Sequence, residues 1–146
     1  MKITHILVPT DFAAASACAL ELAVEMARVF DAKVTLLHVW DLPIYPYMDF
    51  MLNSAVITEV EDAASKGLDR ALEDLQKTMP GAYSKLKTGL PWQGILTATE
   101  ELGADLVIMG THGRHGLSRL TLGSVAEKVV RLSKVPVLTV HGPPQA

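Results

Sequence analysis

Residues 110–124 read GTHGRHGLSRLTLGS and join an apolar segment, DLVIM at 105–109, to a segment of helical character that begins near Ser124. The short apolar segment is typical of a strand that is covered on both faces of a sheet. Glycines allow a positive φ and close backbone approach, so consecutive N–H groups can turn inward. A helix that begins where such a turn ends adds further N–H donors and the positive end of its dipole. The stretch therefore predicts an anion site that suits a phosphate.

The glycine spacing in this stretch is G-x2-G-x9-G-S, formed by Gly110, Gly113, Gly123 and Ser124. It is neither the phosphate loop G-x4-G-K-[ST] nor the dinucleotide motif G-x-G-x-x-G. We expect Ser124 both to cap the helix and to bind a phosphate oxygen. Taken singly, each glycine would also suit an ordinary turn. The phosphate interpretation depends on the combination of glycines, preceding strand, following helix and local charge.

Strand-like and helix-like segments alternate along the rest of the chain. Short runs rich in β-branched residues predict strands, and apolar positions three or four residues apart predict helices. The predicted strands are residues 3–8, 33–40, 83–88, 105–109 and 136–140, and the predicted helices are residues 13–30, 53–79, 91–102 and 124–133. This β-α-β-α-β-α-β-α-β order predicts one α/β domain over residues 1–146. We expect a Rossmann-like, five-stranded, mostly parallel sheet with helices on both faces.

The first two helices carry apolar stripes that should face the sheet. Thr10 and Asp11 are expected to offer the N-cap of the first helix, because their side chains suit that position. The predicted stripes are Ala17, Leu20, Val24 and Ala27 in the first helix, and Val56, Val60, Ala64, Leu68, Ala71 and Leu75 in the second.

Ligands of such folds bind beyond the carboxyl ends of the strands, where the strand order reverses. In this chain that edge should carry residues 9–11, 38–40 and 110–124. The intervening residues 42–53 contain two prolines and clustered aromatics, and we expect them to form a loop.

The composition is that of an ordinary globular protein, with 146 residues, 49% hydrophobic and 20% charged, and it fits one core. Cys18 is the sole cysteine, so no internal disulfide forms, and we expect it to pack in the core. No signal-peptide pattern or apolar run of roughly 18 residues is present. We therefore expect a cytoplasmic protein that does not insert into membranes.

The net charge of −3 is unevenly distributed. Residues 110–134 carry five cations and one anion, whereas the rest of the chain carries eight cations and 15 anions. A small positive region within an acidic protein favours a local anion site over broad nucleic-acid binding. The five cations are Arg114, Arg119, Lys128, Arg131 and Lys134.

The stretch GTHGRHGLSRLTLGSVAEKVVRLSKVPVLTV, residues 110–140, resembles the carboxyl-terminal signature of the universal stress protein family. ILVPTDF at 6–12 and LLHVW at 36–40 resemble the first two strands of that family, so the resemblance covers essentially the whole chain. It implies the nucleotide-binding branch of the family, with a fold like that of adenine nucleotide alpha hydrolases. The implied ligand is ATP or a close adenine nucleotide, with Mg²⁺ as a candidate companion.

The resemblance also implies residue roles. Pro9, Thr10 and Asp11 would line the floor of the site, with Asp11 at a ribose hydroxyl or a magnesium-bound water. The backbone of Val39 would bind the adenine edge. The residues expected to wrap the ribose and phosphates are Gly110, Thr111, His112, Gly113 and Arg114, and those expected to close over the phosphates are Gly123, Ser124 and Val125.

A homodimer that pairs through residues 136–140, from Pro136 to Val140, is implied as well. Such pairing would also cover an apolar edge strand that is otherwise prone to aggregation. Three aromatic residues leave two interpretations open: Trp40, Tyr45 and Tyr47 either flank the adenine or cover the sheet edge.

Our first hypothesis is a binding module that holds ATP and signals its occupancy in a stress response. A slow ATPase or adenylyl-transfer enzyme on the same fold is the alternative, and a domain that uses the loop for protein contacts is a third. We assign no catalytic residue, because no general base or phosphate-loop lysine is recognisable. The five histidines lack metal-ligand spacing, so no metal site is predicted.

Overall fold

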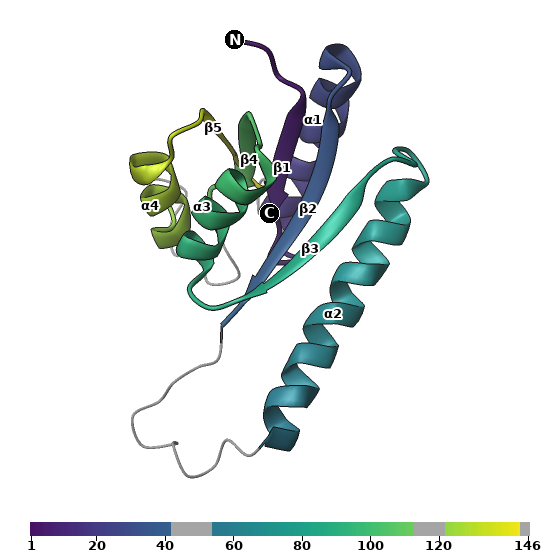
Figure 1. The fold of residues 1–146 in the computed structure, drawn as a ribbon, viewed down its shortest axis with the longest axis vertical. Helices are drawn as coiled ribbons and strands as arrows, with labels where there is room; N and C mark the ends of the chain where they lie inside the picture. Colours follow the sequence, from purple (N-terminus) through teal and green to yellow (C-terminus); the bar gives the residue numbers. More distant parts are fainter. Residues whose placement is uncertain (42–53, 113–121, 144–146) are drawn as a thin grey trace.

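Helices and strands alternate along the chain as the sequence predicts (Figure 1). The structure is a computed structural model that describes residues 1–41, 54–112 and 122–143. Within these ranges the elements are β1 (His5–Pro9), α1 (Ala14–Phe30), β2 (Lys33–Trp40), α2 (Ser54–Gln76), β3 (Tyr83–Thr88), α3 (Pro91–Leu102), β4 (Leu106–Gly110), α4 (Ser124–Leu132) and β5 (Val137–Val140). None of these helices is both long and apolar enough to span a bilayer.

The strands form one sheet in the order β3-β2-β1-β4-β5, and every neighbouring pair is parallel. β1 lies at the centre, where Ile6 aligns with Val34 of β2 on one side and with Leu106 of β4 on the other. Because parallel neighbours require a crossover, each helix connects two strands across a face of the sheet. The predicted α/β fold is confirmed.

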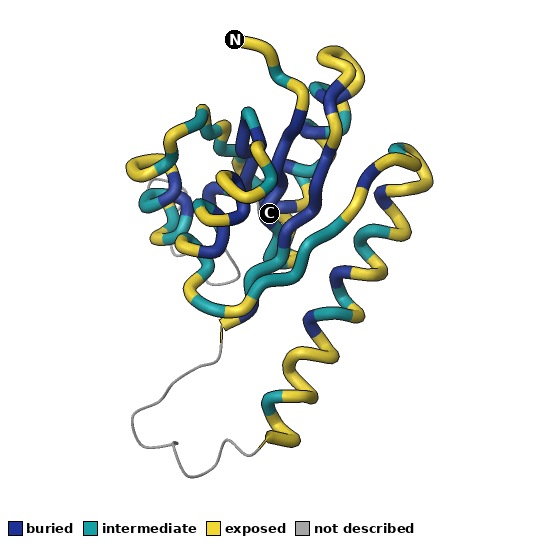
Figure 2. Tube along the Cα trace, viewed as in Figure 1, coloured by how far each residue is buried: buried dark blue, intermediate teal, exposed yellow. Residues whose placement is uncertain are grey.

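Both faces of the sheet are covered, because successive strand residues point to opposite faces. Ile6 and Val8 of β1 pack with the side chains of α1 and α2. Leu7, between them, packs with the side chains of α3 and α4. Figure 2 shows the central strands as a buried layer between helices whose outer surfaces are exposed. The middle residues of these strands are therefore mostly apolar on both faces instead of alternating in polarity.

β1 includes Pro9, whereas the sequence predicted a strand over residues 3–8 that stops before it. The His5 carbonyl accepts a hydrogen bond from the Asp105 N–H at 2.9 Å, so odd-numbered residues of β1 direct their backbone groups toward β4. The pairing with β4 ends at Leu7 and Val107. Because Pro9 has no N–H to donate, the ladder with β4 does not continue past Leu7.

The face of α1 that contacts the sheet differs in part from the predicted stripe. Ala27 is buried as predicted, but Ala17 is exposed, and Leu20 and Val24 are half-buried. The buried residues of the helix are Ala15, Ser16, Ala19, Ala23 and Ala27. Small side chains allow the helix backbone to lie close to the strands, so alanines occupy the contact and the larger residues flank it.

α2 packs on the sheet through only part of its predicted stripe. Ala64, Leu68 and Leu75 are buried, whereas Val56 and Val60 are 38% and 37% exposed. Figure 1 shows the reason, because the first turns of α2 extend past the carboxyl end of β3. A stripe that continues beyond the sheet has no strand to cover it.

His5 lies buried near the amino edge of the sheet and joins three elements. Its Nδ1 is 3.2 Å from the Leu102 carbonyl oxygen at the end of α3, and its Nε2 is 2.7 Å from Thr35 Oγ1 of β2. A carbonyl only accepts hydrogen bonds, so Nδ1 carries a proton and Nε2 of the neutral ring accepts from the Thr35 hydroxyl. Burial lowers the pKa of His5, although the hydrogen bond to Leu102 opposes this effect.

Acidification is therefore expected to destabilise the fold through His5. The unfolded chain has an ordinary histidine pKa of about 6.5, so it binds the proton more readily than the folded chain, and stability falls as pH decreases below that value. Urea unfolding at several pH values between about 7.5 and 5 tests this. The His5→Gln variant should show a smaller decrease across this window. Parallel pH profiles for the two proteins would contradict the prediction.

Candidate functional site at the carboxyl edge

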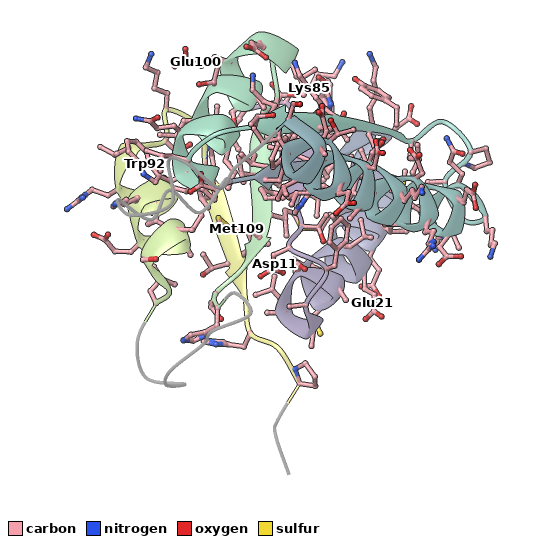
Figure 3. The ribbon with its side chains drawn as sticks, turned by 90° about the horizontal axis from the view of Figure 1, so that it is seen from below. Asp11, Glu21, Lys85, Trp92, Glu100 and Met109 are labelled. Atoms are coloured by element: carbon pink, nitrogen blue, oxygen red, sulfur yellow. The ribbon has the colours of Figure 1, made fainter. Side chains whose placement is uncertain are left out.

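The strand order reverses between β1 and β4 at the centre of the sheet. From β1 the chain proceeds to β2 and β3 on one side, whereas β4 and β5 lie on the other. The segments that follow β1 and β4 consequently diverge at the carboxyl edge, which is where the ligand crevice of such folds lies. In Figure 3, which views the molecule from this edge, Asp11 lies near the start of α1 and Met109 lies on β4. Asp11 is one of the residues that the sequence predicted for this edge.

The turn after β1 is held by its own side chains. Asp11 Oδ1 accepts hydrogen bonds from the Ala13 N–H at 3.0 Å and from Ser16 Oγ at 2.9 Å. Thr10 Oγ1 accepts from the Phe12 N–H at 3.0 Å. Ala13, not Thr10 or Asp11, is the N-cap residue of α1, so the capping prediction was wrong. Asp11 lies two residues before the N-cap and holds the start of the helix through its bonds to Ala13 and Ser16.

Phe12 and His38 support the same turn from the α2 side. The His38 Nδ1–H donates to the Thr10 carbonyl at 2.8 Å. The Phe12 ring lies 4.5 Å from the His38 ring, and Phe12 has a φ of +63°, which is uncommon for a residue with a side chain. A Cβ at Gly67 of α2 would lie 3.3 Å from the Phe12 ring. The segment predicted as the floor of the site, residues 9–11, is thus held by contacts with β2 and α2.

Val39 presents its backbone toward the crevice. The Leu37 carbonyl accepts from the Thr10 N–H at 2.8 Å, and the Trp40 carbonyl accepts from the Gly89 N–H at 3.0 Å. Since the direction alternates along a strand, the N–H and C=O of Val39 face the β1 side, beyond the last paired residues, Pro9 and Leu37. This position suits a planar ligand edge that has one donor and one acceptor.

The backbone that follows β4 closes onto the start of α4 through Thr111. The Thr111 N–H donates to the Val140 carbonyl of β5 at 2.9 Å, and its carbonyl accepts from the Gly123 N–H at 2.7 Å. A Cβ at Gly123 would lie 2.7 Å from that carbonyl oxygen. A side chain at position 123 would clash with the Thr111 backbone, so this position requires glycine. The contact places the amino end of α4 beside the end of β4.

Gly123 is also the N-cap residue of α4, and no side chain caps the helix. Ser124 is the first helical residue, so the prediction that it caps the helix was wrong. The first helical hydrogen bond runs from the Glu127 N–H to the Gly123 carbonyl at 2.9 Å. The N–H groups of Ser124, Val125 and Ala126 consequently have no intrahelical acceptor. They are suitable donors for an anion.

Gly110 has a packing role that the sequence did not reveal. A Cβ there would lie 2.8 Å from the Ala15 Cβ and 2.9 Å from the Ser16 backbone nitrogen. The glycine therefore lets α1 rest directly on the end of β4. Gly113 and Arg114, which were also predicted for the site, lie outside the described residues.

The positive charge counted along residues 110–134 is divided between distant places. Arg131 pairs with Glu127 at 3.4 Å, and Lys134 pairs with Glu100 at 2.7 Å near the amino edge of the sheet. Lys128 lies 5.3 Å from the centre of the Trp92 ring. Arg114 and Arg119 lie outside the described residues. The local charge excess therefore overstates the cations available to the crevice.

Trp40 is buried, with 6% exposure. It shares a strand face with Val34 and Leu36, which pack with α1 and α2. Its position agrees with covering the sheet, one of the two interpretations left open, whereas Tyr45 and Tyr47 lie outside the described residues.

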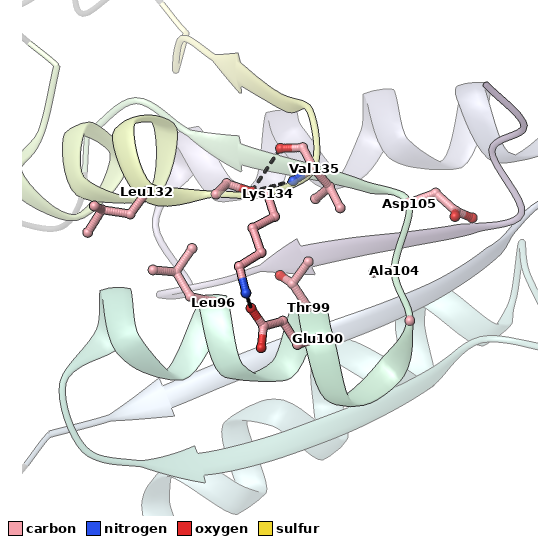
Figure 4. A pocket seen from close by; sticks show the side chains of 10 residues that line it. Leu96, Thr99, Glu100, Ala104, Asp105, Leu132, Lys134 and Val135 are labelled. Atoms are coloured by element: carbon pink, nitrogen blue, oxygen red, sulfur yellow. Dashed lines mark hydrogen bonds and ion pairs between the residues drawn. The ribbon is translucent and has the colours of Figure 1, made fainter.

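A pocket of about 370 Å³ lies at the opposite edge, between the carboxyl ends of α3 and α4 (Figure 4). The Lys134–Glu100 ion pair crosses it, and Leu96, Thr99 and Val135 line it. It opens at the amino ends of β4 and β5. None of the predicted site residues line it.

The open parallel sheet with a reversal point between β1 and β4 defines a doubly wound α/β protein, a class whose ligands bind at the carboxyl edge of the sheet. A model of the universal stress protein family matches residues 2–141. The chain belongs to this family. "Universal stress protein MJ0531" of Methanocaldococcus jannaschii is 31% identical over 94% of this chain and 82% of its own length.

Solved structures share the fold. The universal stress protein UspA from Lactobacillus plantarum superposes with a TM-score of 0.81 at 27% identity, covering 96% of this chain and 99% of its own. A universal stress protein family protein from Arabidopsis thaliana, solved with AMP bound, has a TM-score of 0.68 at 21% identity and covers 96% of this chain and 92% of its own. That likeness shows the shared fold.

Proposed function

We propose that this protein is a cytoplasmic binding module that holds ATP, or a close adenine nucleotide, at the carboxyl edge of its sheet. The observation that carries the proposal is the contact between Gly123 and the Thr111 carbonyl, which places the amino end of α4 beside the end of β4. Helix N–H donors at a reversal point suit a phosphate. The AMP bound by the related Arabidopsis thaliana protein supports an adenine nucleotide as the ligand.

Each part of the nucleotide has a candidate partner in this arrangement. The N–H and C=O of Val39 complement the acceptor and donor on the adenine edge. Asp11 would receive a ribose hydroxyl or a magnesium-bound water. Thr111, His112 and the N–H groups at the start of α4 would hold the phosphates, with Gly113 and Arg114 as further candidates. Pro9 and Thr10 would form the floor together with Asp11, and Gly110 would lie beside the ribose and phosphates.

Binding without rapid turnover is the form of the function that we propose. Asp11 already accepts two hydrogen bonds from the start of α1, which suits a fixed ligand-binding carboxylate better than a proton-transferring base. Partner proteins would then detect the bound nucleotide through the conformation of the residues around the site.

Identification of the released nucleotide tests this proposal directly. Protein purified without added nucleotide is denatured, the supernatant is analysed by mass spectrometry, and the refolded protein is titrated with ATP. We expect release of an adenine nucleotide, or saturable binding on titration, with negligible turnover in the presence of Mg²⁺. Rapid multiple turnover would replace the binding module with an ATPase. No binding at millimolar ATP would overturn the proposal altogether.

We further propose that the protein forms a homodimer through β5. The two edge strands differ in character. On β3, Lys85 and Lys87 lie 2.7 and 2.8 Å from Glu101, and these hydrogen bonds lower the pKa of Glu101 to about 2. Charged side chains on an edge oppose pairing with another chain. On β5, Leu138 is 36% exposed, and the strand VLTV carries no charge. β5 is therefore the better surface for a second copy.

Removal of an outward-facing N–H from β5 is expected to abolish the dimer. The Val140 and Pro136 carbonyls bond β4, so the backbone groups of Thr139 face away from the sheet. Thr139→Pro removes that donor without removing a bond to β4. Ser84→Pro, at an outward position of β3, is the matched control and should remain dimeric. Light scattering measures both masses. A dimeric Thr139→Pro variant would contradict pairing through β5.

A further inference from the structure

The Thr111 hydroxyl connects two histidines from different parts of the chain. Thr111 is buried, with 2% exposure. Its Oγ1 lies 3.0 Å from Nδ1 of His112, the second residue after β4, and 3.3 Å from Nδ1 of His141, the residue that follows β5. The hydrogen bond from the Thr111 N–H to the Val140 carbonyl, 2.9 Å long, fixes the two segments beside each other. The three polar groups therefore form one connected chain.

The number of hydrogen atoms on these three side chains limits how the hydrogen bonds among them can be arranged. A hydroxyl carries one hydrogen and donates one hydrogen bond, but it can accept others. When Oγ1 donates to Nδ1 of one ring, the other ring must supply an Nδ1–H to that oxygen. With both rings neutral, one has its proton on Nδ1 and the other has it on Nε2.

The other ring nitrogen of His112, Nε2, indicates which tautomer an anionic ligand requires. His112 Nε2 is buried and has no hydrogen-bond partner among the described residues. A buried polar nitrogen without a partner costs free energy that a ligand can recover. Phosphate oxygens only accept hydrogen bonds when ionised, so they require a proton on Nε2. An unprotonated Nε2 would instead repel them.

We propose that His141 is a positioning residue that acts through Thr111 to keep the proton of His112 on Nε2. The His141 Nδ1–H donates to Thr111 Oγ1, and the Thr111 hydroxyl donates to His112 Nδ1. His112 Nε2–H then points a donor at a phosphate oxygen. In many sites a hydrogen bond to one ring nitrogen sets the tautomer of a functional imidazole in the same way. The phosphate part of this inference rests on the proposed nucleotide function.

The tautomer is measured first, on full-length protein without nucleotide. Long-range ¹H–¹⁵N NMR at about pH 8, where an ordinary imidazole is neutral, distinguishes Nδ1–H from Nε2–H. We expect His112 to be in the Nε2–H form in the wild type. His141→Ala and Thr111→Val should each introduce the Nδ1–H form. His141→Asn, whose amide N–H can replace Nδ1–H, should retain the wild-type tautomer.

Nucleotide affinity is measured second, by calorimetric titration of the same variants. We expect His141→Ala to bind ATP about fivefold to tenfold more weakly, as for one impaired hydrogen bond to a charged group. Its affinity for adenosine should be unchanged, and His141→Asn should bind ATP like the wild type. A wild-type His112 in the Nδ1–H form, or an unchanged tautomer in His141→Ala, would overturn the inference. Failure of the wild type to bind ATP would instead overturn the proposed function and leave the tautomer result standing.

Discussion

A Gly123→Val variant is expected to bind ATP roughly 100-fold more weakly than the wild type, a loss of about 2.7 kcal/mol. The new Cβ would lie 2.7 Å from the Thr111 carbonyl oxygen, which is backbone and cannot rotate away. The hydrogen bond between the Gly123 N–H and that oxygen would break. The amino end of α4 would then separate from β4, and its N–H donors would no longer converge with His112. Calorimetric titration with ATP measures the loss.

Gly81→Val is the matched control, because a Cβ at Gly81 meets nothing within 4 Å. It makes the same chemical change at a turn between α2 and β3, at the amino edge of the sheet, and should leave the affinity unchanged. Circular dichroism of both variants establishes that each is folded. An affinity within threefold of the wild type for folded Gly123→Val would show that this closure does not form the phosphate site.

The largest expected effect on stability comes from Gly110→Ala. The added methyl group would lie 2.8 Å from the Ala15 Cβ and 2.9 Å from the Ser16 nitrogen, so α1 would have to move as a body. Overpacking of this kind costs about 3 kcal/mol, and we expect the melting temperature to fall by roughly 10 °C. α1 also packs on β1 through Ala19 and Ala23, which limits how far it can shift. Thermal and urea unfolding measure the change.

Gly81→Ala again provides the comparison for a glycine with room around it. Replacing glycine where the backbone is unstrained is expected to change stability by less than about 1 kcal/mol, and in the stabilising direction. If Gly110→Ala proved as stable as Gly81→Ala, the close contact between α1 and β4 would not be a constraint of the fold.

Several boundaries could be predicted from sequence because their causes are local. The ends of β2 and β3 coincide with the predicted residues 33–40 and 83–88. α3 begins with Pro91 at its first turn and ends at Gly103, whose φ is +61°. Proline and glycine determine such ends through their own backbone preferences. No tertiary contact is needed to recognise them.

The predictions that were wrong concern positions where a contact with a residue distant in sequence determines the structure. The predicted stripe of α1 included Leu20 and Val24, which are half-buried, whereas small residues such as Ala19 and Ala23 make the contact because the helix lies close to the strands. Ser124 was expected to cap α4, but Gly123 takes that position because Thr111 leaves no space for a side chain. The charge count over residues 110–134 suggested one positive region, yet Lys134 lies beside Glu100 at the opposite edge.

By itself the sequence determined the fold class, the family and the segments that carry the candidate site, because periodicity and glycine spacing are properties of consecutive residues. Only the tertiary structure decided what those residues do. Whether Gly110 serves α1 or a ligand, and whether His141 acts with His112, depends on which segments meet at the carboxyl edge. His112 and His141 are 29 positions apart in the sequence, and they meet at Thr111 because β4 and β5 are adjacent strands.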